Sequence, residues 1–138
     1  MAKVSGEEDD ALYRGEWLTI RAMRTSNGRL PAKEWLDGLQ KTDYGKFLAA
    51  AKVMETTLRV NRPPAGRAET IQGSSQGLWE LRITPKGKKG GPHLRMAYRR
   101  EARTLWVAHG FTKQSNKLDT RDIRTADSVA EQWKEGKQ

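Results

Sequence analysis

Three short segments in the second half of the chain alternate apolar and polar residues and follow one another closely. They cover about 78–84, 94–100 and 104–112 of the 138-residue sequence. A period of two is typical of β-strands, because successive side chains point to opposite faces of a sheet. A basic, glycine-rich connection (TPKGKKGGP) joins the first two segments, and a tight turn at Glu101–Ala102 joins the second and third. Sequential strands with short links pair antiparallel, so these segments predict an antiparallel sheet.

The first part of the chain adds one strand and one short helix. Residues 16–24 alternate like a strand, and Asn27–Gly28 then provides the strongest turn dipeptide of the chain. Proline suits the first turn of a helix, which predicts a short helix from Pro31 to about Gly38.

Two longer helices are predicted from apolar residues that recur at helical spacing. The first begins at Thr42 or Asp43 and ends before the Asn61–Pro64 segment. Its apolar stripe is expected to be core material and consists of Tyr44, Phe47, Leu48, Ala51, Met54 and Leu58. The second runs from about Thr120 to Lys134. Its apolar face consists of Ile123, Ala126, Ala130 and Trp133.

The resulting element order is β-α-α-β-β-β-α, which predicts an α+β domain with a mostly antiparallel, twisted sheet and helices packed on one face. With 138 residues, of which 36% are hydrophobic, the chain is expected to bury one core. Residues 1–12 are expected to be a flexible acidic tail, which leaves 13–138 as a single domain. Residues 62–77, rich in Pro, Gly and Ser, are expected to be a loop.

Positive charge is concentrated in the part of the chain that contains the three strands. Residues 82–124 hold 12 Lys and Arg and 3 Asp and Glu, so the net charge of this segment is +9. The net charge of the whole protein is also +9. A positive field confined to one sheet suits a face that binds a polyanion, whereas a merely soluble surface would spread its charge. Nucleic acid or nucleoprotein is therefore the leading class of partner, ahead of anionic lipid. The KGKK run is expected to be a solvated loop that attracts phosphate nonspecifically.

Several chemistries are excluded or disfavoured by what the sequence lacks. It has no cysteine, which excludes disulfides, a thiol nucleophile and thiolate metal sites. No Asp, Glu and His cluster has metal-ligand spacing, and no phosphate-binding GxxxxGK loop or Ser-His-Asp motif is present. The acidic N-terminus is unlike a secretory signal, and no apolar run approaches the ~20 residues of a membrane span. We therefore expect a cytoplasmic protein that needs no metal or cofactor and does not contact a membrane.

Strand alternation places a set of basic side chains on one face of the predicted sheet. Arg82 and Arg95 lie opposite the apolar residues of their strands, and a bend late in the third strand would bring Lys113 to the same face. An aromatic ring, Phe111 or Tyr98, would lie close by. Guanidinium groups bind phosphate oxygens and a ring stacks on a base, so this set suits an RNA backbone with an unstacked base.

Each basic candidate also has a purely structural interpretation. Arg82 could simply pair with Glu80, or with a carboxylate near the C-terminus. Lys113 could be an ordinary surface lysine.

The two histidines are weaker candidates. His109 is expected to share a face with Val107 and Phe111 in an apolar strand, where a histidine is more often half-buried and hydrogen-bonded than functional. His93 stands beside a proline in a loop and is a weaker candidate still.

Three motifs, in this order along the chain, resemble the HigB branch of the RelE toxin superfamily and its phage-derived homologues. They are LWELR at 78–82, RMAY at 95–98 and LWVAHGFTKQSNK at 105–117, followed by a terminal helix. The resemblance implies a RelE-like fold and a small ribosome-dependent endoribonuclease that cuts messenger RNA in the decoding site. It also implies that a cognate antitoxin, expected to carry a helix-turn-helix, holds the enzyme silent.

The resemblance implies roles for individual residues. Arg82 matches the arginine of the ELR motif, Arg95 opens the next motif, and Lys113 matches the first lysine of the usual GF-x-K-K stretch. The implied reaction is a metal-free attack of a ribose 2′-hydroxyl on its own 3′-phosphate, with the 5′-oxygen leaving. Arg82 and Arg95 would stabilise the negative charge that develops. Lys113 would transfer the proton, with His109 in reserve. The residues expected to contact RNA around this site are Lys86, Lys88, Lys89, Arg99, Lys117, Phe111 and Tyr98.

Two other functions are compatible with the same features. One is a non-catalytic RNA- or ribosome-binding domain, which predicts binding that falls steeply with salt but no strand scission. The other is a structural or regulatory phage protein whose basic face binds an acidic protein, which predicts complexes that are insensitive to RNA competitors.

Overall fold

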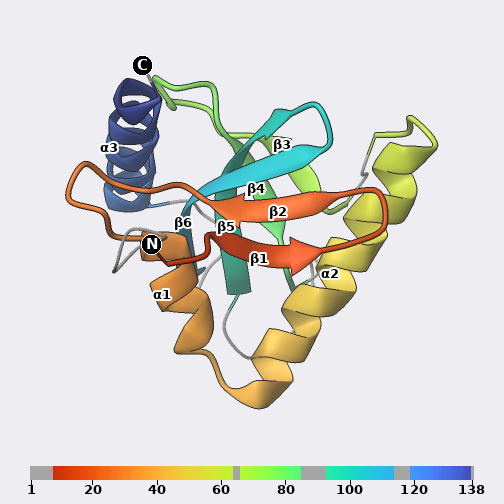
Figure 1. Cartoon of the computed structure of the whole chain (residues 1–138). Helices are drawn as coiled ribbons and strands as arrows, with labels where there is room; N and C mark the ends of the chain where they lie inside the picture. The colour runs from red at the N-terminus through yellow and green to blue at the C-terminus, as the bar shows by residue number, and fades with distance from the viewer. Residues whose placement is uncertain (1–7, 64–65, 85–92, 114–118, 138) are drawn as a thin grey trace, which may run out of the picture.

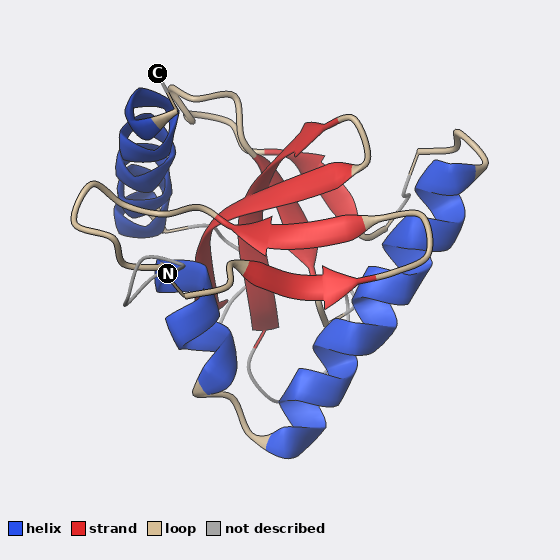
Figure 2. Ribbon diagram, viewed as in Figure 1, coloured by secondary structure: helices blue, strands red, loops and turns tan. Residues whose placement is uncertain are grey.

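The computed structural model describes residues 8–63, 66–84, 93–113 and 119–137, which form a mixed sheet flanked by helices (Figure 1, Figure 2). The elements are β1 (Ala11–Arg14), β2 (Thr19–Ala22), α1 (Pro31–Asp37), α2 (Lys41–Arg59), β3 (Ala68–Thr70), β4 (Trp79–Arg82), β5 (His93–Glu101), β6 (Thr104–Lys113) and α3 (Thr120–Gly136). The six strands lie in the order β1-β2-β6-β5-β4-β3. Neighbouring strands pair antiparallel, except that β2 runs parallel to β6. The predicted α+β class with a mostly antiparallel sheet is confirmed.

Two strands of this sheet were not predicted. Strand β1 begins at Ala11, inside the segment expected to be a flexible tail, and its Leu12 is buried in the core. Residues 1–7 of that segment lie outside the described part of the chain. Strand β3 lies in the segment expected to be a loop and pairs with β4 at the edge of the sheet. Both strands have four residues or fewer, which is too short for alternation to identify them.

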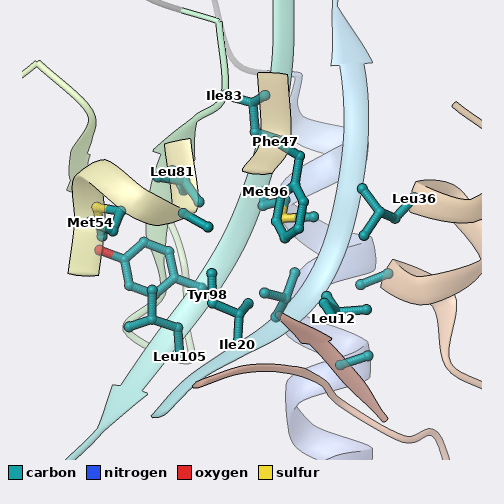
Figure 3. Close-up of a cluster of buried hydrophobic side chains, with 14 of the residues drawn as sticks. Leu12, Ile20, Leu36, Phe47, Met54, Leu81, Ile83, Met96, Tyr98 and Leu105 are labelled. Carbon is teal, nitrogen blue, oxygen red and sulfur yellow. The ribbon is translucent and has the colours of Figure 1, made fainter. Parts of the chain in front are cut away.

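The helices divide between the two faces of the sheet. On one face, Leu36 of α1 and Phe47 of α2 pack with Met96 of β5 (Figure 3). On the other face, Trp133 of α3 lies in a second buried cluster with Ala97, the strand neighbour of Met96. The expected placement of the helices on one face therefore holds for α1 and α2, while α3 covers the opposite face. The apolar side of α3 needs its own partner, because α1 and α2 already cover the first face.

Helix α2 is rotated relative to the orientation that its apolar stripe predicts. Phe47 and Met54 are fully buried as expected. Tyr44 and Leu48, however, are 38% and 40% exposed. Glu55 is buried on this helix instead, with 6% of its surface exposed.

The Glu55 carboxylate connects α2 to the link between β1 and β2. The Tyr13 hydroxyl donates to Oε1 at 2.5 Å, and the backbone N–H groups of Trp17 and Leu18 donate to Oε2 at 2.6 and 2.8 Å. Gly15 leaves room for the carboxylate, because a Cβ at this position would lie 2.2 Å from Oε2. The hydrogen bonds, first of all that from Tyr13, keep the pKa of Glu55 below its usual value despite burial.

Strand β6 contains one residue more than its partner β5. Val107 pairs with Tyr98 and His109 pairs with Ala97, so Ala108 has no counterpart. Such a bulge shifts the alternation of the residues that follow it by one position.

The bulge determines the direction of the side chains in the last part of β6. Phe111 lies in the cluster under α3, whereas Val107 lies in the core under α1 and α2, so the expectation that both share a face is wrong. Gly110 faces α1, and a Cβ there would lie 2.2 Å from Cε3 of Trp35. Lys113 lies on the same face as Phe111, two residues further along the strand.

Gly110→Ala is expected to destabilise the protein by about 1–3 kcal/mol, because the added methyl group would overlap the Trp35 ring. Gly45→Ala in α2 is the control: no heavy atom lies within 4 Å of its Cβ position. Alanine at that helical position should stabilise by about 1 kcal/mol. Urea unfolding of both variants measures the difference, and a Gly110→Ala midpoint equal to wild type would contradict the close packing of Trp35.

Candidate functional site

Basic residues from three strands meet at one end of the sheet, where β4 and β6 end and β5 begins. Arg82 of β4 lies opposite Arg95 of β5, and His93 of β5 lies opposite Lys113 of β6. These side chains face α3, because the alternate residue Leu94 lies in the core under α1 and α2. The structure thus brings together the arginines and the lysine that the sequence singles out.

Glu80 of β4 lies between these basic side chains. Its Oε2 is 3.5 Å from Nζ of Lys113 and 3.7 Å from Nε of Arg95. Its Oε1 is 4.0 Å from Nη2 of Arg82. We call these four residues the Glu80 cluster. Their side chains are 2–7% exposed, so water screens their mutual interactions only weakly.

Arg82 lies on the outer side of the Glu80 cluster. Its guanidinium group also pairs with Glu69 of the edge strand β3, whose side chain is 56% exposed. The alternative interpretation of Arg82, a pairing with Glu80, is therefore present in the structure but as the longer of the two contacts. Three cations face two carboxylates here, which leaves an excess of positive charge.

Arg95 is buried with 1% of its surface exposed, and its hydrogen bonds are directed into the protein. Its Nη1 donates to the carbonyl oxygen of Thr84 at 3.1 Å, to the Thr84 hydroxyl at 3.2 Å and to the carbonyl oxygen of Leu94 at 3.0 Å. Burial lowers the pKa of Arg95, against the opposing effect of Glu80. Arg95 is thus placed to act through its charge and to position the end of β4.

Lys113 has the electrostatic surroundings of a group that transfers protons. Burial lowers its pKa, and the charges of Arg95 and Arg82 lower it further, while Glu80 opposes them. A lysine with a lowered pKa is a stronger acid than an ordinary lysine.

His109 lies on the same face but makes other contacts. Its Nε2 is 3.0 Å from Oδ1 of Asp122 in α3, and its ring stacks on Phe111 with centroids 5.3 Å apart. It also stands four residues before Lys113 in an extended strand, which separates the two Cα atoms by about 13 Å. This is the half-buried, hydrogen-bonded histidine of the structural interpretation, and it connects β6 to α3.

The predicted RNA-contacting residues occupy different environments. Phe111 is 5% exposed in the cluster under α3, and Tyr98 is 5% exposed in the core on the opposite face of the sheet. Burial raises the pKa of Tyr98 to about 12, and neither ring is available for stacking on a base. Arg99 is half-buried, and its Nε lies 3.8 Å from Oε2 of Glu101. Lys86, Lys88, Lys89 and Lys117 lie outside the described residues.

Glu80 and Thr84 are components of the site that the sequence argument did not assign to it. From the sequence alone, Glu80 is expected only as a structural partner of Arg82. Its position two residues before Arg82, on the same face of one strand, is the signal that could have placed it among the basic residues. Thr84 gives no such signal, because its role comes from the buried hydrogen bonds of Arg95.

The described ranges contain no group of three or more His, Asp and Glu residues that could hold a metal ion. Among the same residues, no helix is long and apolar enough to cross a membrane.

Comparison with protein families shows what the chain is similar to. A family model described as Phage derived protein Gp49-like (DUF891) matches residues 34–131. The matched range extends from α1 into α3 and includes every residue of the Glu80 cluster. No curated protein matches the chain. The chain therefore belongs to the Gp49-like family of phage-derived proteins, which is related to the toxins of toxin–antitoxin systems.

Proposed function

We propose that this protein is a HigB-like toxin that cuts messenger RNA on the ribosome, in the cytoplasm, without a metal ion. The observation that carries the proposal is the convergence of Arg82, Arg95 and Lys113 on Glu80 at one end of the sheet. A general attraction for nucleic acid needs only a basic surface and does not require three cations gathered within one buried cluster. Family membership supports the same class of activity.

The reaction we propose is an internal transfer at phosphorus. The ribose 2′-oxygen attacks the adjacent 3′-phosphate, and the bond to the 5′-oxygen of the next nucleotide breaks. The products are a 2′,3′-cyclic phosphate and a 5′-hydroxyl. Lys113, whose pKa is lowered mainly by burial, donates the proton that the leaving 5′-oxygen needs.

The arginines stabilise the charge of the pentavalent phosphorane. Arg82 is the arginine on the outer side of the Glu80 cluster, and the RNA phosphate takes the place of Glu69 as its partner. Arg95 contributes through its charge from its buried position. In the absence of RNA, Glu80 holds the three cations together against their mutual repulsion.

Two partners follow from this proposal. The ribosome fixes the message in the geometry for in-line attack, and this positioning supplies much of the rate, so naked RNA is expected to be a poor substrate. A cognate antitoxin protein, expected to carry a helix-turn-helix, holds the enzyme inactive.

Primer extension on a defined message in a purified translation system tests the proposal. Wild-type protein is compared with Arg82→Ala and Lys113→Ala, each with and without a chelator. Discrete cuts in the ribosomal A site that persist with chelator and disappear in both variants are expected. An intact message with normal translation would remove the nuclease, and blocked translation without cuts would keep the ribosome as target but remove the chemistry.

A non-catalytic RNA- or ribosome-binding protein is the second candidate. The near-complete burial of the Glu80 cluster favours it, because side chains with 2–7% exposure suit a structural ion cluster. This candidate predicts ribosome binding that weakens steeply with salt. It also predicts that neither the wild-type protein nor any Lys113 variant cuts the message.

A further inference from the structure

His93 is a buried histidine to which neither the sequence argument nor the proposed reaction gives a role. It is the first residue of β5 and has 9% of its surface exposed. Its Nδ1 is buried and has no hydrogen-bond partner among the described residues. The other buried side-chain atom found without one in these ranges is Nε of Arg95, two residues along the same strand face. Buried polar atoms normally have a hydrogen-bond partner, so an imidazole nitrogen that has none among the described residues is unusual.

The position of His93 places this imidazole at the Glu80 cluster. His93 lies directly opposite Lys113 in the antiparallel pair β5–β6. The Cβ atoms of residues that face each other in this way are about 4.5–5.5 Å apart. The backbone next to His93 is held firmly, because the Leu94 N–H donates to the Thr84 hydroxyl at 3.1 Å.

We propose that His93 is the general base of the cleavage reaction, an inference that rests on the proposed function. Its Nδ1 takes the proton from the ribose 2′-hydroxyl while the bond between the 2′-oxygen and phosphorus forms. The bond from phosphorus to the 5′-oxygen breaks, and Lys113 gives that oxygen a proton. One proton is taken and one is given, so the enzyme completes the cycle when a proton returns from His93 to Lys113 through water.

The other candidates for the base are engaged elsewhere. His109 is hydrogen-bonded to Asp122 and stacked on Phe111. Glu80 is paired with three cations, so both of its oxygens are engaged. The described residues offer no hydrogen-bond partner to Nδ1 of His93, and this nitrogen accepts a proton in the tautomer that carries hydrogen on Nε2.

Chemical rescue distinguishes a base from a structural histidine. His93→Gln and His93→Gly are expected to lower the single-turnover cleavage rate by about 10²–10⁴-fold. Added imidazole should raise the cleavage rate of His93→Gly in proportion to the imidazole concentration. More basic substituted imidazoles should raise this rate further. Lys113→Ala should not respond to them. Both variants are expected to melt cooperatively above the assay temperature, His93→Gly at a lower temperature than wild type, and thermal melting checks that they fold.

A second substrate separates the base from the acid. A message with sulfur in place of the 5′-oxygen at the cut site has a leaving group that needs no proton. Lys113→Ala should recover most of its rate on this substrate, whereas His93→Gln should remain slow.

Three results would overturn the assignment. The first is a His93→Gln variant that cuts at the wild-type rate. The second is a slow His93→Gly variant whose cleavage rate does not depend on the basicity of the added imidazole. The third is that the sulfur substrate restores the cleavage rate of His93→Gln rather than that of Lys113→Ala. Each of them leaves wild-type cleavage, and with it the proposed function, intact. If the wild-type protein cuts neither substrate, both the proposed nuclease activity and the role of His93 as its base are refuted.

Discussion

Lys113→Arg is expected to lower the rate of message cleavage by about 10²–10⁴-fold, the usual contribution of a general acid or base. Arginine keeps the positive charge and can still pair with Glu80, but it does not release a proton in the accessible pH range. The lowered pKa of Lys113, which burial and the neighbouring arginines produce, is the property that arginine cannot supply. Single-turnover cleavage of a ribosome-bound message measures the effect.

Lys134→Arg is the matched control for this substitution. Lys134 lies on α3, is exposed, and donates to Oε1 of Gln76 at 3.3 Å, away from the Glu80 cluster. Its replacement is expected to leave the rate unchanged, and Lys113→Arg should bind programmed ribosomes as tightly as wild type. A Lys113→Arg variant that cuts at the wild-type rate would mean that Lys113 serves as a positive charge and that the proton comes from elsewhere.

Glu55→Ala is expected to lower the free energy of unfolding by about 3–5 kcal/mol, because each buried donor left without an acceptor costs about 1–3 kcal/mol. The substitution leaves the Tyr13 hydroxyl and the N–H groups of Trp17 and Leu18 without their acceptor. A domain of this size has a total stability of about 5–15 kcal/mol, so the loss is a large part of it. Urea unfolding at neutral pH measures it.

The pH dependence of stability tests the same carboxylate. Because folding lowers the pKa of Glu55, its contribution is present above the ordinary glutamate pKa and is lost as pH falls through the folded value. The stability gap between wild type and Glu55→Gln should therefore narrow in acid. Glu16→Ala is the control, since Glu16 is 92% exposed and 3.8 Å from Arg59, and should cost less than about 1 kcal/mol. A Glu55→Ala loss no larger than that of Glu16→Ala would contradict the buried hydrogen bonds.

The sequence predicts most of the fold because the longer elements repeat their pattern over several turns or residues. Helices α2 and α3 and strands β5 and β6 appear within a few residues of their expected ends. The rotation of α2 was not predictable, because burial of Glu55 depends on donors in a distant link between two strands. The bulge at Ala108 is equally invisible in the sequence, since alternation through Val107 continues without a break.

In the candidate site too, local sequence patterns predict some features, whereas others depend on contacts with distant parts of the chain. Alternation along β4 and β5 is enough to place Arg82 and Arg95 on one face. The burial of these two arginines cannot be predicted in the same way. It depends on α3 and its cluster, which cover the face of the sheet that is expected from the sequence to be open to solvent. The sequence predicts a loop at His93. Its pairing with Lys113 depends on the register of two strands, which side-chain composition does not specify.

The parallel pairing of β2 with β6 determines how late in synthesis the protein can fold. Ala22 is made 85 residues before its partner Val107, and Lys113 follows Val107. Closing such a long loop costs entropy that only the finished central strand can offset. The nascent chain therefore carries no complete Glu80 cluster until Lys113 has left the ribosome. If the protein cuts messages as proposed, this order of assembly protects the ribosome that is producing it.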